Sequence, residues 1–334
     1  MNLVNEKTVI DNQPQLTELL AYLKINNYRF ITISPASHEI VNSRLQNSVA
    51  NNLIEIFGWN RLFKREDIDA ALFDLMQLAN IAVKVGDYWK SQLRVSSIDA
   101  LLFLHSAYPT LGNEAVFFGP DTYRFANVVQ QYLASKDFIS RDFISNLPPT
   151  YRAVDIGTGS GVGAVLLALA LTELKIESEI VASDINSEAL SLARANINAA
   201  AIHNIELIQS NLLNTVAGSF DLIVANPPYL LDKTERAYRH GGGQLGADLS
   251  LAIVDAAIER LNPNGTLLLY TGVAIVNGHD AFLAAAAAKL NIAGFTYQYV
   301  EIDPDIFGEE LNSEAYHMAD RIAAVVLTAR RQAT

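Results

Sequence analysis

The stretch RAVDIGTGSGVGAVLLALAL, residues 152–171, joins an apolar strand to a helix through a glycine-rich loop. The strand contains one acid, Asp155, and a continuous apolar run with helical character starts near Val162. Three glycines lie between the strand and the helix: Gly157, Gly159 and Gly161. They permit a tight turn and a close approach of the backbone to a ligand. The stretch therefore predicts a strand–loop–helix unit that holds a nucleotide-like ligand, with Thr158 in the same loop.

Two other interpretations of this loop stay open at this point. Gly159, Gly161 and Ala164 also satisfy the dinucleotide pattern G-x-G-x-x-A, and Asp184 follows twenty residues after the loop. An NAD-dependent oxidoreductase would fit that pattern. The glycines could also serve only the tight packing of a strand against a helix.

Strands and helices alternate through the rest of the chain. Strands rich in Val, Ile and Leu that alternate with helices of 10 to 15 residues predict a mostly parallel sheet covered on both faces, an α/β fold. In such a sheet, ligands bind beyond the carboxyl ends of the strands. The predicted strands are 153–156, 180–183, 205–208, 222–225, 266–270, 296–302 and 323–328, and the predicted helices are 162–174, 187–199, 250–261 and 281–290.

Polar residues follow the second and third of these strands. Asp184 is placed to accept the hydroxyls of a ribose, and Ile185 could lie against an adenine ring. The alternative for Asp184 is an acid that stabilises the dipole of the helix beginning near Ser187. Asn211 stands where the edge of an adenine would lie, unless it is part of a solvated turn.

The fourth strand ends in FDLIVANPPYL, residues 220–230. Pro227 and Pro228 have no N–H and cannot continue a ladder, so the carbonyls of Asn226 and Pro227 can accept hydrogen bonds from a ligand. The side chain of Asn226 adds an acceptor, and Tyr229 adds a flat face. Together they predict a site for a planar group with an NH₂, whose two hydrogens are held while the nitrogen attacks an electrophile. A plain Asn-Pro-Pro turn is the alternative.

The motifs DIGTGSG, ASDIN and VANPPY, in this order, resemble the S-adenosylmethionine-dependent methyltransferases with a seven-stranded Rossmann-like sheet. The N-P-P-Y motif is similar to that of their amino-methylating branch, and within it the chain looks most like the release-factor glutamine methyltransferases of the HemK type and bacterial small methyltransferases. The resemblance covers about residues 114–330. It implies that the cofactor is S-adenosylmethionine. The glycine loop would then surround its methionine part, and Asp184 would bind its ribose. Asn211 would contact its adenine, at a position where the family usually has Asp.

The resemblance extends to two further segments. Pro120-Asp121-Thr122 is similar to the segment that leads into the cofactor site, which places Thr122 there, and residues 241–272 resemble the family's glycine-rich loop, helix and fifth strand. It also implies that Asn226, Pro227, Pro228 and Tyr229 hold the target nitrogen. GGGQ at 241–244 resembles the sequence such enzymes methylate in release factors, and we interpret this as coincidence.

The acceptor is not determined by these motifs. Net charge is −12, with 10 basic and 12 acidic residues over 1–120 and 14 basic and 24 acidic residues over 121–334. Clustered Lys and Arg, which phosphate binding needs, are not evident. A protein glutamine is therefore favoured over an adenine N6 or guanine N2 of RNA or DNA, and a small metabolite is a third possibility.

The chain divides into three predicted parts. Residues 1–112 form a smaller, mainly helical domain, residues 113–150 a bridge leading into the cofactor site, and residues 151–334 the methyltransferase domain. Leucine spacing predicts helices over 15–25 and 67–78, and alternation around Gly86-Asp87 predicts a hairpin. This part resembles a winged-helix module, or is a helical cap with one hairpin. If it binds nucleic acid, the chain could instead be a regulator with a methyltransferase domain as sensor.

Composition excludes several other kinds of site. There is no cysteine, so disulfides, thiolate zinc sites and thiol catalysis are excluded, and the six histidines lack ligand spacing. We expect no metal site, although Asp303, Asp305, Glu309 and Glu310 lie together in a long acidic segment, 303–320, that we interpret as a lid or a substrate wall. No apolar run reaches membrane-spanning length and no signal-peptide core is present, so we expect a cytoplasmic protein.

Overall fold

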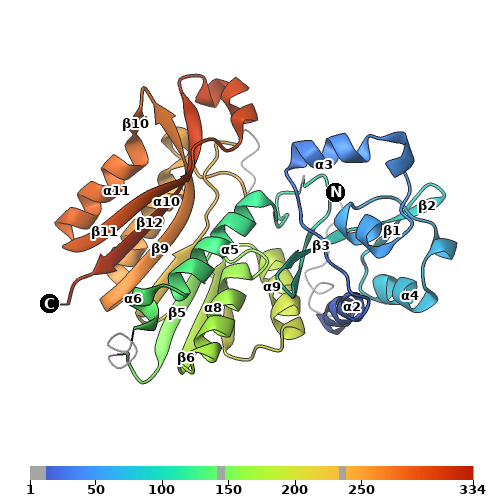
Figure 1. The fold of residues 1–334 in the computed structure, drawn as a ribbon, viewed down its shortest axis with the longest axis horizontal. Helices are drawn as coiled ribbons and strands as arrows, with labels where there is room; N and C mark the ends of the chain where they lie inside the picture. Colours follow the sequence, from blue (N-terminus) through green and yellow to red (C-terminus); the bar gives the residue numbers. More distant parts are fainter. Residues whose placement is uncertain (1–12, 111, 141–146, 233–237, 334) are drawn as a thin grey trace.

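The computed structural model describes residues 13–110, 112–140, 147–232 and 238–333. A twisted sheet forms the centre of the larger part of the molecule, and the N-terminal part packs beside it (Figure 1). The predicted bridge over 113–150 includes residues 141–146, which lie outside the described residues, as do residues 1–12. No helix among the described residues is long and apolar enough to span a membrane.

The central sheet has the order β11-β12-β9-β8-β5-β6-β7. Five neighbouring strands, from β9 to β7, pair in parallel, and β12 is antiparallel to both of its neighbours, so that β11 points the same way as those five. The two-residue strand β10 (His279–Asp280) pairs with the end of β9. The others are β5 (Tyr151–Ile156), β6 (Ser178–Asp184), β7 (Ile205–Gln209), β8 (Phe220–Ala225), β9 (Leu261–Val276), β11 (Phe295–Asp303) and β12 (Arg321–Arg331).

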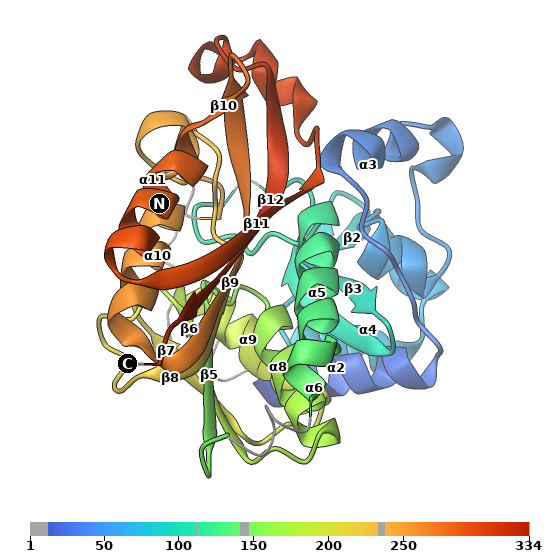
Figure 2. The ribbon, with the colours of Figure 1, turned by 60° about the vertical axis from the view of Figure 1, so that its left-hand side comes forward.

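Helices cover both faces of the sheet, as Figure 2 shows. One apolar core lies under α5, α8 and α9, and a second core lies under α10 and α11. The predicted α/β fold with seven main strands is confirmed. These helices are α5 (Pro120–Leu133), α8 (Val162–Glu173), α9 (Ser187–Ala199), α10 (Asp248–Arg260) and α11 (Ala281–Ile292), and a short α6 (Lys136–Ile139) follows α5.

The N-terminal part contains helices and two hairpins. The predicted hairpin around Gly86 is confirmed as β1 and β2, but a second hairpin, β3 and β4, follows directly, so the expectation of one hairpin is wrong. The described helices are α2 (Gln13–Ile25), α3 (Pro35–Asn42) and α4 (Ala70–Leu78), with short helical turns η1 (Leu45–Asn47), η2 (Ile54–Gly58) and η3 (Arg65–Asp67). The strands are β1 (Ala82–Val85), β2 (Tyr88–Ser91), β3 (Leu93–Ile98) and β4 (Leu101–Ser106).

The second hairpin is buried, and this explains why alternation did not reveal it. Five of the six residues of β3 are buried, including both serines, because the hairpin lies between the N-terminal helices and α9. Its turn, Asp99-Ala100, contains no glycine, and Asp99 itself takes a positive φ. A strand buried on both faces has no period-two pattern.

The N-terminal part and α9 share one apolar core. Leu19 and Leu23 of α2 belong to the same cluster of buried side chains as Leu192 of α9. Polar contacts reinforce this junction, since Asn196 of α9 accepts a hydrogen bond from the backbone N–H of Leu104 at 2.8 Å and donates to the carbonyl of Ser160 at 2.8 Å. The N-terminal part therefore packs directly on the helix that follows β6.

Candidate functional site

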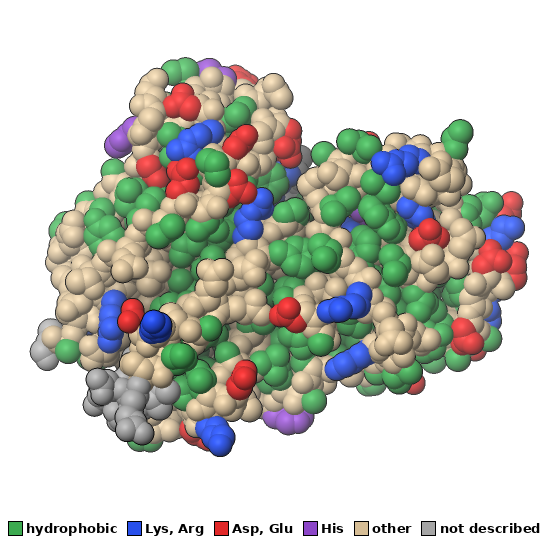
Figure 3. All heavy atoms as spheres, in the orientation of Figure 1, with side chains coloured by type: hydrophobic (Ala, Val, Ile, Leu, Met, Phe, Trp, Pro, Cys, Tyr) green, Lys and Arg blue, Asp and Glu red, His purple; other side chains and the backbone are tan. Residues whose placement is uncertain are grey.

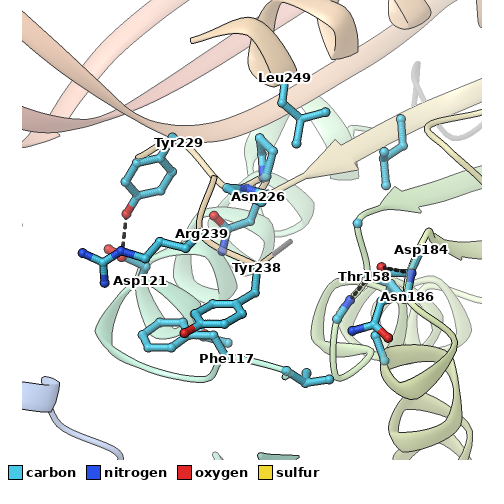
Figure 4. A pocket seen from close by; sticks show the side chains of 18 of the residues that line it. Phe117, Asp121, Thr158, Asp184, Asn186, Asn226, Tyr229, Tyr238, Arg239 and Leu249 are labelled. Atoms are coloured by element: carbon cyan, nitrogen blue, oxygen red, sulfur yellow. Dashed lines mark hydrogen bonds between the residues drawn. The ribbon is translucent and has the colours of Figure 1, made fainter. Parts of the chain in front are cut away.

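A cavity of about 280 Å³ opens at the carboxyl ends of β5, β6, β7 and β8. This is the edge at which a parallel sheet places its ligands. Twelve of the thirteen residues predicted for the site line it: Thr122, Asp155, Gly157, Thr158, Gly159, Asp184, Ile185, Asn211, Asn226, Pro227, Pro228 and Tyr229. Figure 4 shows how side chains from these separate elements face the same space.

Gly161 is the predicted residue that does not line this cavity. It caps the N-terminus of α8 with a φ of +88°, and a Cβ on it would lie 3.2 Å from the Cβ of Ala193 in α9. Gly161 therefore allows the N-terminus of α8 to approach Ala193 of α9 closely. The prediction that it contacts the cofactor has no support in this arrangement, whereas Gly157 and Gly159, also at positive φ, do face the cavity.

Asp155 ties the glycine loop to the helix that follows it. One carboxylate oxygen, Oδ2, accepts from the hydroxyl of Thr158 at 2.6 Å and from the N–H of Ala164 at 3.0 Å. The side chain is 1% exposed, and this burial raises its pKa to about 7. The carboxylate leaves no room for a side chain at Gly163, where a Cβ would lie 2.7 Å from it.

Asp184 links the end of β6 to the same loop. Its Oδ2 accepts from the N–H of Gly159 at 2.8 Å, and its Oδ1 accepts from the N–H of Asn186 at 2.9 Å. Burial raises the pKa of its carboxyl. The side chain of Asn186, and not Asp184, caps α9 by accepting from Glu188. Beside this carboxylate, Ile185 is 58% exposed and lines the cavity.

The chain leaves the sheet at Asn226. β8 ends at Ala225, and no turn or loop hydrogen bond among the described residues ends on the carbonyl of Asn226 or Pro227. The side-chain amide of Asn226 likewise has no hydrogen-bond partner in the part of the chain that the structure describes, although it faces the cavity (Figure 4). After the prolines, the N–H of Leu230 donates to the carbonyl of Arg239, and the N–H of Gly241 donates to the carbonyl of Leu230.

Tyr229 is held by a residue that the sequence did not single out. Its hydroxyl donates to Oδ2 of Asp121 at 2.6 Å, and the hydroxyl of Tyr270 donates to Oδ1 at 2.7 Å. Arg124 forms an ion pair with the same carboxylate at 3.0 Å. Asp121 lies beside the predicted Thr122, and its position in the Pro120-Asp121-Thr122 segment was the only signal available.

Glycines support the backbone behind Tyr229. A Cβ on Gly246 would lie 2.1 Å from the carbonyl oxygen of Tyr229, and a Cβ on Gly241 would lie 2.7 Å from its Cα. The segment 241–246 therefore packs against the Asn226–Tyr229 turn itself. This contact gives the glycine-rich loop a structural role.

The acidic segment 303–320 forms part of the cavity wall. Phe307 and Glu309 line the cavity, and the segment contains the short helical turns η5 (Gly308–Asn312) and η6 (Glu314–Tyr316). Two ion pairs anchor it, Asp303 with Arg124 and Glu310 with Arg239. In Figure 3, acidic side chains gather over this region, beside the hollow that separates it from the N-terminal part.

Two further aromatic rings line the cavity. Phe117 and Tyr238 are nearly parallel, with an interplanar angle of 8° and centroids 6.1 Å apart. The hydroxyl of Tyr238 donates to the carbonyl of Thr110 at 2.6 Å, which fixes its ring. Across the described residues, no group of three or more His, Asp or Glu side chains could hold a metal ion.

Comparison with known proteins gives this geometry a context. Residues 133–276 match the family model described as Methyltransferase small domain. The chain is 32% identical over 189 residues to a release factor glutamine methyltransferase of Lactococcus lactis subsp. lactis, covering 53% of this chain and 64% of that protein. It is 35% identical over 133 residues to a ribosomal protein uL3 glutamine methyltransferase of Bordetella pertussis, covering 36% of this chain and 43% of that protein.

A solved structure is similar at lower identity. A methyltransferase from Pyrococcus furiosus is 21% identical, with a TM-score of 0.39, over 58% of this chain and 82% of that one. The chain spans about half to two thirds of the length of the curated relatives it matches.

Proposed function

We propose that this chain, whose residues 133–276 match the Methyltransferase small domain model, transfers a methyl group from S-adenosylmethionine to the side-chain nitrogen of a protein glutamine. The observation that carries this proposal is the side-chain amide of Asn226, which has no hydrogen-bond partner among the described residues. It faces the same cavity as the glycine loop and Asp184, beside two carbonyls that accept no loop hydrogen bond from the described part of the chain.

The residues at one end of the cavity fit the cofactor. The loop at Gly157 and Gly159 would hold the methionine part against the N-terminus of α8, where the backbone approaches most closely. The carboxylate of Asp184 would accept the ribose hydroxyls, Ile185 would cover a face of the adenine, and Asn211 would meet its edge. When bound, S-adenosylmethionine supplies an electrophilic methyl group on a sulfonium.

Replacing Asp184 tests this assignment. The variant Asp184→Ala should weaken the binding of S-adenosylhomocysteine at least tenfold, about 1.4 kcal/mol, because it removes the ribose acceptor and frees the N–H of Gly159. Calorimetry measures this directly. Unchanged affinity would remove Asp184 from the ribose site, and binding of NAD alone to the wild type would favour an oxidoreductase.

The residues at the other end fit a planar amide. An amide NH₂ is a weak nucleophile because its lone pair is delocalised into the carbonyl. The side-chain oxygen of Asn226 and the carbonyl of Pro227 can hold the two hydrogens and orient the lone pair toward the methyl group. The extra proton can leave after the new bond has formed, so no histidine or lysine base is needed in this site.

The identity of the acceptor rests on two observations. The relatives reported above are named for glutamine on a release factor and on ribosomal protein uL3, and both acceptors are proteins. The chain has a net charge of −12, which does not favour a nucleic acid. We place the protein in the cytoplasm, where such acceptors are made, and we keep the division into 1–112, 113–150 and 151–334 as part of this proposal.

A methyl-transfer assay tests the acceptor. Purified release factor, uL3, bulk RNA and DNA are each incubated with the enzyme and cofactor carrying a tritiated methyl group, and labelled protein is then analysed by mass spectrometry. Label on a glutamine side chain supports the proposal. Label confined to a nucleic acid or to small molecules would overturn the choice of acceptor, and no transfer to any fraction would count against the enzyme activity itself.

A further inference from the structure

Three side chains from three elements converge on Asp121. Tyr229 follows β8, Tyr270 lies in β9 and Arg124 lies one turn further along α5. The two hydroxyls take different carboxylate oxygens, at 2.6 and 2.7 Å, and the guanidinium of Arg124 also reaches Oδ1, at 3.0 Å. Asp121 is 5% exposed, so water contributes little to these contacts.

The carboxylate fixes which groups donate. Each of the two phenols donates its O–H to one oxygen of Asp121. Burial together with the charge of Asp121 raises the pKa of Tyr229 well above its ordinary value. Tyr229 therefore keeps its proton and its donor role throughout the physiological range of pH.

The ring of Tyr229 is also confined along its sides. A Cβ on Gly272 would lie 2.3 Å from two of its ring carbons, so strand β9 passes directly against the ring. The ring of Phe307 lies 6.1 Å away at an interplanar angle of 60°. The hydrogen bond from the hydroxyl is the polar contact that selects one orientation within this space.

We infer that Asp121 is a positioning residue for methyl transfer: it holds the hydroxyl of Tyr229 so that the ring presents one fixed surface to the acceptor beside Asn226. Through Arg124 the same network reaches Asp303, at 2.8 Å, and so connects the acceptor site to the wall formed by 303–320. This inference rests on the proposed function, because it gives Tyr229 a role toward the acceptor.

Substitutions that keep shape test the inference. Asp121→Asn offers one acceptor oxygen where the carboxylate has two, with an NH₂ that only donates in place of the other, so one phenol loses its acceptor. Tyr229→Phe removes the hydroxyl that donates to Asp121. We expect each to lower the turnover number on the acceptor protein at least tenfold and to leave the affinity for S-adenosylhomocysteine within threefold of wild type. Tyr299→Phe is the matched control, because Tyr299 also donates to a carboxylate, that of Asp280, but lies outside the cavity lining.

The double variant separates positioning from general damage. If Asp121 acts through Tyr229, adding Asp121→Asn to Tyr229→Phe should lower turnover by less than twofold more, whereas independent roles would multiply the two losses. Urea unfolding of each variant shows whether a loss of turnover follows a loss of stability. Independent losses, or a fall in turnover for Tyr299→Phe equal to that for Tyr229→Phe, would overturn the inference.

A spectroscopic readout decides the inference without an acceptor. The chain has 13 tyrosines, and 3-fluorotyrosine can be placed in all of them, with the ¹⁹F resonance of Tyr229 assigned by its loss in Tyr229→Phe. Asp121→Asn should shift and broaden that resonance, while Tyr299→Phe should leave it unchanged. An unchanged Tyr229 resonance in Asp121→Asn would overturn the inference. A shifted resonance without any methyl transfer would support the contact and count against the proposed function alone.

Discussion

Asn226 is the residue on which the proposed chemistry depends most directly. Its amide lacks a partner among the described residues, so replacing it should remove no structural hydrogen bond. We expect Asn226→Ala to keep its affinity for S-adenosylhomocysteine and to lose methyl transfer a hundredfold or more, about 3 kcal/mol of transition-state stabilisation. Single-turnover transfer measures the loss, and Asn198→Ala on the exposed face of α9 is the control. Wild-type transfer by Asn226→Ala would make the motif structural.

Asp155 gives the cofactor loop a dependence on pH. Burial raises its pKa to about 7, whereas an unfolded chain has an Asp pKa of about 3.9. Between these values the folded protein keeps a proton that the unfolded chain releases. The free energy of unfolding therefore falls as pH rises from about 4 to about 7, and this contribution is lost above that range.

Asparagine at position 155 should behave like the protonated acid. Its oxygen can accept from Thr158 and Ala164 as Oδ2 does, without a charge to bury. Near pH 4, the free energy of unfolding of Asp155→Asn should be close to that of the wild type. From there to about pH 7, the variant should become steadily more stable than the wild type. Urea unfolding between pH 4 and 8, without cofactor, measures both. A difference in stability that stays constant with pH would contradict the assignment.

The site residues that motifs revealed are those whose chemistry is local. Glycines at positive φ, an acid at a strand end and prolines that stop a ladder each leave a signature in a few neighbouring residues. Asp121 has no such signature, because its partners Tyr229 and Tyr270 are more than a hundred residues away. Gly161 shows the converse, since its glycine signature is real, but it accompanies a positive φ at the start of α8 and a close approach to Ala193 of α9.

At the scale of elements, the strand–helix alternation was readable because buried strands and their covering helices differ in length and composition. The β3–β4 hairpin was not readable, since burial on both faces removed its alternation and Asp99 replaced a turn glycine. The glycine-rich loop of 241–246 was visible in the sequence. Its function was not, because the backbone that it supports at Tyr229 is brought to it only by the turn after β8.

Gly246 tests that loop. It has a φ of +83°, and a Cβ would lie 2.1 Å from the carbonyl oxygen of Tyr229. Gly278 has a φ of +72° with nothing within 4 Å of the same position. Gly278→Ala should therefore cost only the left-handed conformation, about 1 kcal/mol of stability. Gly246→Ala should cost more and should also lower methyl transfer at least tenfold, because the backbone of the acceptor turn must move. Equal effects of the two substitutions on transfer would contradict this role.

At the scale of the whole molecule, the junction between the N-terminal part and the sheet was not predicted. The sequence indicated a separate unit over 1–112, but its leucines share a core with Leu192 of α9. An amphipathic pattern shows that a helix has a buried face, and it does not show which partner covers that face. The contacts of Asn196 with Leu104 and Ser160 add buried polar bonds to the same junction.

This shared core should make the two parts unfold together. Both tryptophans, Trp59 and Trp89, lie in the N-terminal part, so tryptophan fluorescence reports that part, while far-ultraviolet circular dichroism reports the whole chain. The two probes should give coincident transitions in urea. S-adenosylhomocysteine at 100 times its Kd stabilises the site by about 2.7 kcal/mol, and the tryptophan transition should shift by that full amount although no tryptophan lines the cavity. If the ligand does not shift the tryptophan transition, the N-terminal part unfolds independently. The packing on α9 would then contribute too little free energy to couple the N-terminal part to the site.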